Sequence, residues 1–251
     1  MTGYEPRFYR DSMGGARWKS FRTVHLETDL WIAVGAACYM PEMESYALTR
    51  AKYYRSLLDS HIRLFPAFLT SLTPLPLPSG DIPELIREMY ISTGKSGTGP
   101  MSAVAGAVAE HICNDICTGF QVKEIIVENG GDIFMKVESP AVISVYAGDS
   151  PLSEKIGIEI TPKISPVSVC CSSGTIGHSL SFGTADACMI ACRSGAQADA
   201  YATAFCNLVK TSGDINAVTE NALQKEDILS VIIIKDDKVG MGGTIEVKLS
   251  R

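Results

Sequence analysis

Two oxygen-bearing side chains, Asp199 and Thr203, stand four residues apart in an alanine-rich stretch. On a helix this spacing places both side chains on one face. A carboxylate and a hydroxyl suit a hard cation such as Mg²⁺, which takes few protein ligands and keeps waters or ligand phosphates. Two simpler interpretations stay open. Thr203 can hydrogen-bond back to the carbonyl of Asp199, and Asp199 can stabilise the N-terminus of its helix as a negative charge.

A second candidate is the turn Asn129-Gly130-Gly131-Asp132, which stands between two predicted strands. The two glycines permit positive φ and a close approach of a ligand to backbone N–H groups. Asn-Gly is also typical of a plain hairpin turn, and this interpretation stays open. Glu128 and Asp132 flank the glycines and add two acids that a plain turn does not require.

A third candidate is the polar loop 172–184, which is rich in hydroxyls and glycine. Such loops bind anions or sugars through backbone amides and side-chain oxygens, although a solvated loop has the same composition. Its candidate cofactor-binding residues are Ser173, Gly174, Thr175 and Gly177. His178 in this loop, or Asp132 in the turn, is the candidate acid–base residue near ligand phosphates.

The elements that must position these groups follow from periodicity and turn residues. We predict strands over 16–26, 29–38, 122–127, 133–137, 141–146, 155–160, 167–171 and 185–192. A terminal hairpin is expected from 228–235 and 243–249, and helices over 42–64, 101–117, 197–210 and 214–223. Long antiparallel runs with few β-α-β alternations favour the α+β class.

The segment 65–83 holds five of the twelve prolines. Because proline lacks the N–H that a helix or a central strand requires, we predict a loop here. Its Leu and Phe content indicates a lid or arm that packs onto the protein. Pro83 suits the first turn of a short helix ending near Ile91. A glycine-rich stretch, 92–100, then precedes the helix 101–117.

The chain has 251 residues, with 46% hydrophobic and 20% charged residues, which is an ordinary globular balance. Its longest nearly apolar run, 30–40, is too short to cross a bilayer, and residues 1–21 lack the apolar core of a signal peptide. A net charge of −6 disfavours non-specific nucleic-acid binding. We therefore expect a soluble cytoplasmic protein with a small-molecule partner, no nucleic acid and no membrane.

The eight cysteines form no C-x-x-C motif, so the sequence predicts neither a zinc ribbon nor a thioredoxin-type site. Most stand in apolar company, which favours small buried side chains in a reducing cytoplasm. The alternative is a protein that handles persulfides, with Cys170, Cys171 or Cys192 as the carrier.

Taken together and in this order, these motifs resemble the ApbE-like proteins, and most closely the ApbE-related family once labelled a thiamine-biosynthesis-like group. The resembling stretches are 27–30, 99–107, 127–133, 174–187 and 198–204. ApbE is known as an FAD:protein FMN transferase that needs Mg²⁺. The resemblance implies a single domain over 1–251 made of two T-fold-like halves, with a boundary near residue 120 and antiparallel sheets packed by helices.

The same resemblance implies a pyrophosphate-binding turn at Asn129, Gly130, Gly131 and Asp132. It implies a magnesium held by Asp199, Thr203 and a backbone carbonyl near Ala105. The sequence departs from ApbE where the family has histidine-isoleucine-aspartate-proline, because here His178 is followed by Ser-Leu-Ser.

Three functions from different classes follow. The first is binding of FAD or a related pyrophosphate nucleotide with Mg²⁺, with a flavin or nucleotide transferase or hydrolase activity. The second is sulfur assimilation, with persulfide handling in homocysteine or cofactor synthesis. The third is a non-catalytic binding or assembly module. Homo-oligomers are common among T-fold proteins, so the resemblance also allows a homo-oligomer.

Overall fold

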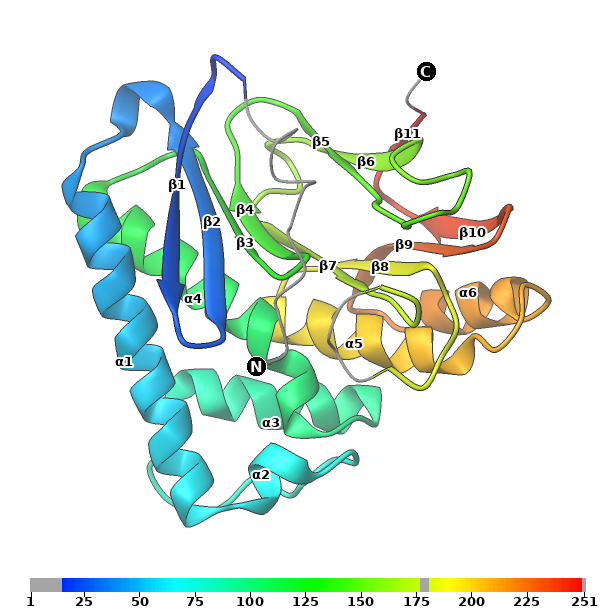
Figure 1. Ribbon diagram of the computed structural model, residues 1–251, viewed down its shortest axis with the longest axis horizontal. Coiled ribbons are helices and arrows are strands. Elements are labelled where there is room, and N and C mark those ends of the chain that lie inside the picture. Colours follow the sequence, from blue (N-terminus) through cyan, green and yellow to red (C-terminus); the bar gives the residue numbers. More distant parts are fainter. Residues whose placement is uncertain (1–14, 177–180, 250–251) are drawn as a thin grey trace.

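The computed structural model describes residues 15–176 and 181–249. An antiparallel sheet runs through the molecule in the order β1-β2-β3-β4-β7-β8-β9-β10, and a small sheet has the order β11-β6-β5 (Figure 1). The strands of the large sheet are β1 (Trp18–His25), β2 (Thr28–Gly35), β3 (Ile125–Asn129), β4 (Asp132–Lys136), β7 (Val167–Ser172), β8 (Ala187–Cys192), β9 (Ile228–Lys235) and β10 (Lys238–Gly243). The small sheet contains β5 (Ala141–Ser144), β6 (Ile156–Ile160) and β11 (Val247–Leu249).

The helices lie on one face of the large sheet, and the small sheet lies on the other (Figure 1). The helices are α1 (Glu42–Leu64), α2 (Ala67–Thr70), α3 (Glu84–Ser96), α4 (Val104–Phe120), α5 (Gly195–Leu208) and α6 (Ile215–Leu223). A short 3₁₀ turn, η3 (Pro100–Ala103), leads directly into α4. The predicted α+β class, with antiparallel sheets packed by helices, is confirmed.

Side chains alternate along the strands, so the large sheet buries apolar residues on both faces. Two hydrophobic cores lie between the sheet and the helices, and a third lies between the large and the small sheet. On the helical side, α1 packs on β1 and α4 packs on β3 and β4, while α5 packs on β7 and β8 and α6 packs on β9 and β10. Helix α3 packs against α4 and α5. On the opposite side, residues such as Trp31, Met135 and Ile232 meet Ile158 of the small sheet. The three layers bury strands β3 and β8 along their whole length.

The large sheet consists of two runs of four strands, β1–β4 and β7–β10. Each run has its principal helix between its second and third strands, α4 in the first run and α5 in the second. The two helices pack against each other at the middle of the molecule. Residue 120 ends α4, inside the first run. The division of the chain into two duplicated halves stays a prediction.

The proline-rich segment 65–83 packs onto the helices, as its composition predicts. Phe68 of α2 is fully buried against Tyr90, with ring centroids 5.1 Å apart. The backbone at Ser71 lies so near Gly99 that a Cβ there would stand 1.8 Å from the Ser71 carbonyl oxygen. The arm is therefore fixed to the residues that precede α4.

Several predicted elements differ from the structure. The strand predicted over 29–38 ends at Gly35 and is followed by a 3₁₀ turn (Ala36–Cys38), and the predicted loop 65–83 contains α2. Helix α3 continues past Ile91 to Ser96 and ends at Gly97, whose φ of 82° is left-handed. The strand that pairs with β9 is β10, and it lies before the predicted segment 243–249. Gly240 of β10 lies against Thr219 and Ile215 of α6, where a side chain would clash. Packing on α6 thus overrides the low strand propensity of the glycines in β10.

The segment after β10 also differs from the prediction. Strand β11 leaves the large sheet and pairs with β6 in the small sheet, with Val247 opposite Ile158.

In the described part of the chain, no helix has the length and apolar character needed to cross a membrane.

Candidate functional site

The predicted glycine turn is a two-residue hairpin between β3 and β4. Gly130 and Gly131 have φ values of 71° and 101°, and Asn129 pairs with Asp132. The Gly131 N–H donates a 2.7 Å hydrogen bond to Oε1 of the fully buried Glu128. The plain-turn interpretation therefore describes the backbone correctly, and a phosphate that approached the Gly131 N–H would have to displace Glu128.

The turn is tied to the start of α4. Nδ2 of Asn129 donates a 3.1 Å hydrogen bond to the carbonyl oxygen of Ala105, and the neighbouring Gly106 N–H donates to Oδ2 of Asp199 at 2.9 Å. The fold thus brings together the turn, the Ala105 carbonyl and the Asp199 carboxylate, which stand far apart in the sequence. Thr203 lies one helical turn beyond Asp199 on α5 and is half-buried.

Helices α4 and α5 can meet here because both carry glycine at the crossing. A Cβ on Gly106 would lie 2.2 Å from the Gly195 carbonyl oxygen, and a Cβ on Gly195 would lie 2.2 Å from that of Gly106. The Gly195 N–H donates to Oε2 of Glu110 at 2.6 Å. Asp199 and Glu110 therefore each accept an N–H from the first turn of the opposite helix.

The carboxylates of Asp132 and Asp199 form a buried pair, and each residue is at most 8% exposed. Burial raises the pKa of Asp199 to about 7, against the effect of its hydrogen bonds from Gly106 and Ala105. Burial and the negative charge of Asp199 raise the pKa of Asp132 well above its usual value, although the Cys171 N–H donates to it at 3.3 Å. Two acids in such a place are stabilised by sharing protons or by a cation.

The donor set suits magnesium. Asp199, Asp132, Thr203 and the Ala105 carbonyl all offer oxygen, the ligand that Mg²⁺ prefers. Within residues 15–176 and 181–249, no three or more His, Cys, Asp and Glu side chains group as metal ligands. A cation here would therefore need the hydroxyl, the carbonyl, and oxygens from water or a bound ligand to complete its shell.

The polar loop after β7 is held by Ser173. Its Oγ accepts hydrogen bonds from the N–H groups of Thr175 (3.1 Å) and Ile176 (3.0 Å). Gly174 has a packing role, because a Cβ there would lie 2.2 Å from the Gly183 carbonyl oxygen. Its N–H donates a 2.8 Å hydrogen bond to the Ala185 carbonyl oxygen. Gly177 and His178 lie outside the described residues.

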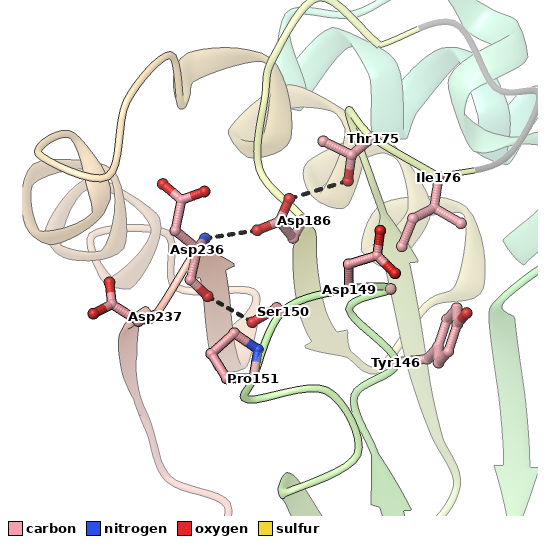
Figure 2. A pocket seen from close by; sticks show the side chains of 10 residues that line it. Tyr146, Asp149, Ser150, Pro151, Thr175, Ile176, Asp186, Asp236 and Asp237 are labelled. Atoms are coloured by element: carbon pink, nitrogen blue, oxygen red, sulfur yellow. Dashed lines mark hydrogen bonds between the residues drawn. The ribbon is translucent and has the colours of Figure 1, made fainter.

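Thr175 lines a surface pocket of about 650 Å³. Figure 2 shows the Thr175 hydroxyl donating to Oδ1 of Asp186 (3.1 Å), while Oδ2 of the same carboxylate accepts the Asp236 N–H (2.6 Å). The other lining residues are Tyr146, Gly148, Asp149, Ser150, Pro151, Ile176 and Asp237. Carboxylates accept hydrogen bonds from sugar hydroxyls and repel a bare phosphate. Neither Asp132 nor Asp199 is among the described residues that line this pocket.

The thiols named by the persulfide hypothesis are poorly placed for reaction. Cys170 and Cys192 are fully buried. Burial raises the pKa of both, and it raises the pKa of Cys171 to about 12. Since the thiolate is the reactive form, these three positions disfavour a persulfide carrier.

Sequence reasoning missed Glu110 as part of this site. The signal was present in two similar pentapeptides, Gly106-Ala-Val-Ala-Glu110 and Gly195-Ala-Gln-Ala-Asp199, which place an acid four residues after the crossing glycine. The sequence indicates Cys170 only as a candidate reactive thiol. In the structure it is hydrogen-bonded to Asp132, and its thiol also donates to the Gly195 carbonyl at 3.8 Å.

The fold is that of the ApbE-like class. The apo flavinyl transferase ApbE of Pseudomonas stutzeri superposes with a TM-score of 0.57 at 14% identity, covering 90% of this chain and 93% of that chain. The ApbE protein of Thermotoga maritima gives 0.55 at 18% identity, covering 91% and 96%. At these identities the similarity establishes the fold alone.

The chain belongs to the ApbE-related family described as AbpE bacteria, whose model matches residues 10–236. A relative from Methanocaldococcus jannaschii, UPF0280 protein MJ1526, is 37% identical over 234 residues, which cover 91% of this chain and 92% of the relative. UPF0280 protein MK0206 of Methanopyrus kandleri is 38% identical over 232 residues, covering 89% and 90%. The predicted resemblance to ApbE-like proteins is confirmed.

Proposed function

We propose that this protein binds FAD, or a related pyrophosphate nucleotide, together with Mg²⁺, and that it acts as a flavin or nucleotide transferase. The observation that carries the proposal is the buried carboxylate pair of Asp132 and Asp199. Their burial raises the pKa of both acids, so the site gains most from a ligand that brings positive charge. The chain also shares its fold with a flavinyl transferase, and this supports the proposed class of reaction by analogy of fold only.

The residues present fit the magnesium of this proposal. Asp199 accepts hydrogen bonds from the Gly106 and Ala105 backbone, and because a carboxylate has about four acceptor sites, it could still offer an oxygen to a cation. Thr203 would supply a hydroxyl from the next turn of α5, and Ala105 a carbonyl oxygen from the start of α4. When bound, Mg²⁺ would neutralise phosphate oxygens and stabilise the charge that develops during transfer.

Asp132 would take the acid–base role. Burial raises its pKa well above the ordinary value, and the Cys171 N–H fixes the orientation of its carboxyl group. His178 stays the alternative for this role. The turn at Gly130 and Gly131 would bring backbone close to the pyrophosphate, and the loop held by Ser173 would contact the nucleoside. Thr175 would offer its hydroxyl in the pocket beside that loop.

The test is a titration of the purified protein with FAD, with and without Mg²⁺, followed by flavin fluorescence. Chromatography of the same samples detects FMN and AMP. Binding that requires Mg²⁺ supports the proposed site, and release of AMP or FMN supports the transferase or hydrolase class. Absence of binding in both conditions would overturn the proposal.

A further inference from the structure

The last part of the loop between β7 and β8, residues 181–184, lies on the C-terminal end of α5. The Phe182 N–H donates a 2.7 Å hydrogen bond to Oδ1 of Asn207, and the Phe182 carbonyl oxygen accepts a hydrogen bond from Nζ of Lys210. Oγ of Ser181 also donates to Oδ1 of Asn207, at 3.2 Å. The backbone on both sides of Phe182 is therefore fixed to the helix and to the residues that follow it.

The side chain of Phe182 is accessible because of this arrangement. The next residue, Gly183, is buried, and a Cβ there would lie 1.8 Å from the Cys206 carbonyl oxygen, so the loop backbone lies directly on α5. Phe182 itself is 53% exposed. A single exposed apolar side chain is common on protein surfaces. Here, however, the hydrogen bonds hold the backbone in place while the aromatic ring is left uncovered.

Helix α5 connects this ring with the buried carboxylate of the candidate site. Asp199, Thr203 and Asn207 follow one another at intervals of four residues, so their side chains lie along one side of the helix. The helical rise places Asn207 about 6 Å beyond Thr203 and about 12 Å beyond Asp199. Phe182 is therefore within reach of a nucleotide whose phosphates lie at Asp199 and whose ring extends along α5.

We propose that Phe182 is a binding residue that stacks on a planar aromatic ring of the bound nucleotide, and that Asn207 is the positioning residue that orients it. This inference rests on the proposed nucleotide function. Stacking on an aromatic side chain recognises the face of a ring and reads no hydrogen-bond pattern. The contact would therefore select a ligand with a planar ring without selecting one particular base.

The test is isothermal titration calorimetry of the full chain with FAD in the presence of Mg²⁺. Phe182→Leu keeps an apolar side chain and removes the ring, so we expect the affinity for FAD to fall about fivefold. Phe182→Tyr keeps the ring and should bind as wild type does. The matched control is Phe65→Leu, which makes the same change at a Phe that is 41% exposed on the arm and should leave the affinity unchanged.

The same comparison with FMN and with ADP identifies the stacked ring, because Phe182→Leu should weaken only the ligand that carries it. An equal loss for both ligands would indicate a general defect of the site and would overturn the proposal. Circular dichroism checks that each variant is folded.

A double variant tests the role of Asn207. Asn207→Ala removes the acceptor of the Phe182 N–H and should lower FAD affinity about twofold or more in the wild-type background. In the Phe182→Leu background it should cause no further loss, because it acts only through the ring. Asn216→Ala, on the exposed side of α6, is the control. The same loss in both backgrounds would overturn the proposal.

The results also separate this inference from the proposed function. If the wild-type protein does not bind FAD with Mg²⁺, the proposed function fails and the stacking contact fails with it. If the wild type binds FAD and Phe182→Leu binds it equally well, the proposed function stands and only the stacking contact is overturned.

Discussion

Asp199 and Glu110 cap each other's helices. The Asp199 carboxylate on α5 accepts the Gly106 N–H of α4 at 2.9 Å, and the Glu110 carboxylate on α4 accepts the Gly195 N–H of α5 at 2.6 Å. Asp199 is buried and Glu110 is half-buried, and desolvation raises the pKa of both carboxyl groups. Only Asp199 also lies beside Asp132, so a comparison of the two carboxylates separates the structural role that they share from the ligand-binding role that we propose for Asp199 alone.

Replacing Asp199 by Asn should keep an acceptor for the Gly106 N–H while removing the charge that a cation needs. We expect Mg²⁺-dependent FAD affinity to fall at least about tenfold, since one charged ligand is lost. Glu110→Gln is the matched control, because it makes the same chemical change at the other cap and should leave that affinity intact. Flavin fluorescence titration measures both variants. Equal affinities of wild type and Asp199→Asn would remove Asp199 from the proposed metal site.

The raised pKa of Asp199 predicts how stability depends on pH. Its folded value of about 7 lies above the ordinary value of 3.8, so the folded state keeps a proton that the unfolded state releases between these pH values. The stabilisation is therefore fully present below about pH 4 and is lost as pH rises towards and through 7. Without Mg²⁺, the contribution of this carboxyl should lower the melting temperature between pH 6 and pH 8.

Magnesium should reverse part of that loss, because it binds the deprotonated carboxylate in competition with the proton. The rise in melting temperature on adding Mg²⁺ should therefore be larger at pH 8 than at pH 6. Differential scanning fluorimetry at both pH values measures it, with Asp199→Asn as the variant in which the difference disappears. The same increase at both pH values would contradict the assignment.

The glycine crossing predicts a large stability loss on adding one methyl group. Gly106→Ala would place a Cβ 2.2 Å from the Gly195 carbonyl oxygen, where the two backbones must separate. We expect a loss of about 3 kcal/mol in the free energy of unfolding. Gly94→Ala in α3 meets nothing within 4 Å and should stabilise by up to about 1 kcal/mol. Urea denaturation compares them, and similar stabilities would show that the helices do not cross as described.

Ser173→Ala should weaken nucleotide binding as well as folding. The substitution removes the acceptor of the Thr175 and Ile176 N–H groups and leaves the loop less ordered. We expect FAD affinity to fall about threefold or more, at a cost of about 1 kcal/mol in stability. Ser56→Ala, on the exposed side of α1, is the control. An unchanged affinity would exclude this loop from the nucleotide site.

The parts of the candidate site whose residues are close together in the sequence could be predicted from it. Asp199 and Thr203 share a helix, and the turn at Gly130 and Gly131 is read from adjacent residues, so spacing alone reveals both. The partners of Asp199 could not be found in this way. Gly106 lies 93 residues away, and its N–H is available only because α4 and α5 cross at two glycines.

The prediction of strands is limited in the same way, because contacts between distant segments are not visible in the local sequence. Strand β8 was predicted from its apolar run, and its burial on all six residues agrees. Strand β10 was missed because Gly240, Gly242 and Gly243 give it low strand propensity. In the fold these glycines are required by contacts with α6 and β9, which the local sequence does not contain. Packing between distant segments thus decides the parts that propensity assigns wrongly.

The order of strands also carries a consequence for how the chain reaches this structure. The hairpin of β1 and β2 is made from the first described residues, yet the neighbour of β2 in the sheet is β3, which begins only at Ile125. During synthesis the N-terminal hairpin must therefore wait, with one edge unpaired, until α1 to α4 have emerged. Such an edge invites pairing with other chains. The charged residues along β1, among them Lys19 and Arg22, disfavour pairing with another chain at the free edge of β1. The free edge of β2 is covered only when β3 pairs with it.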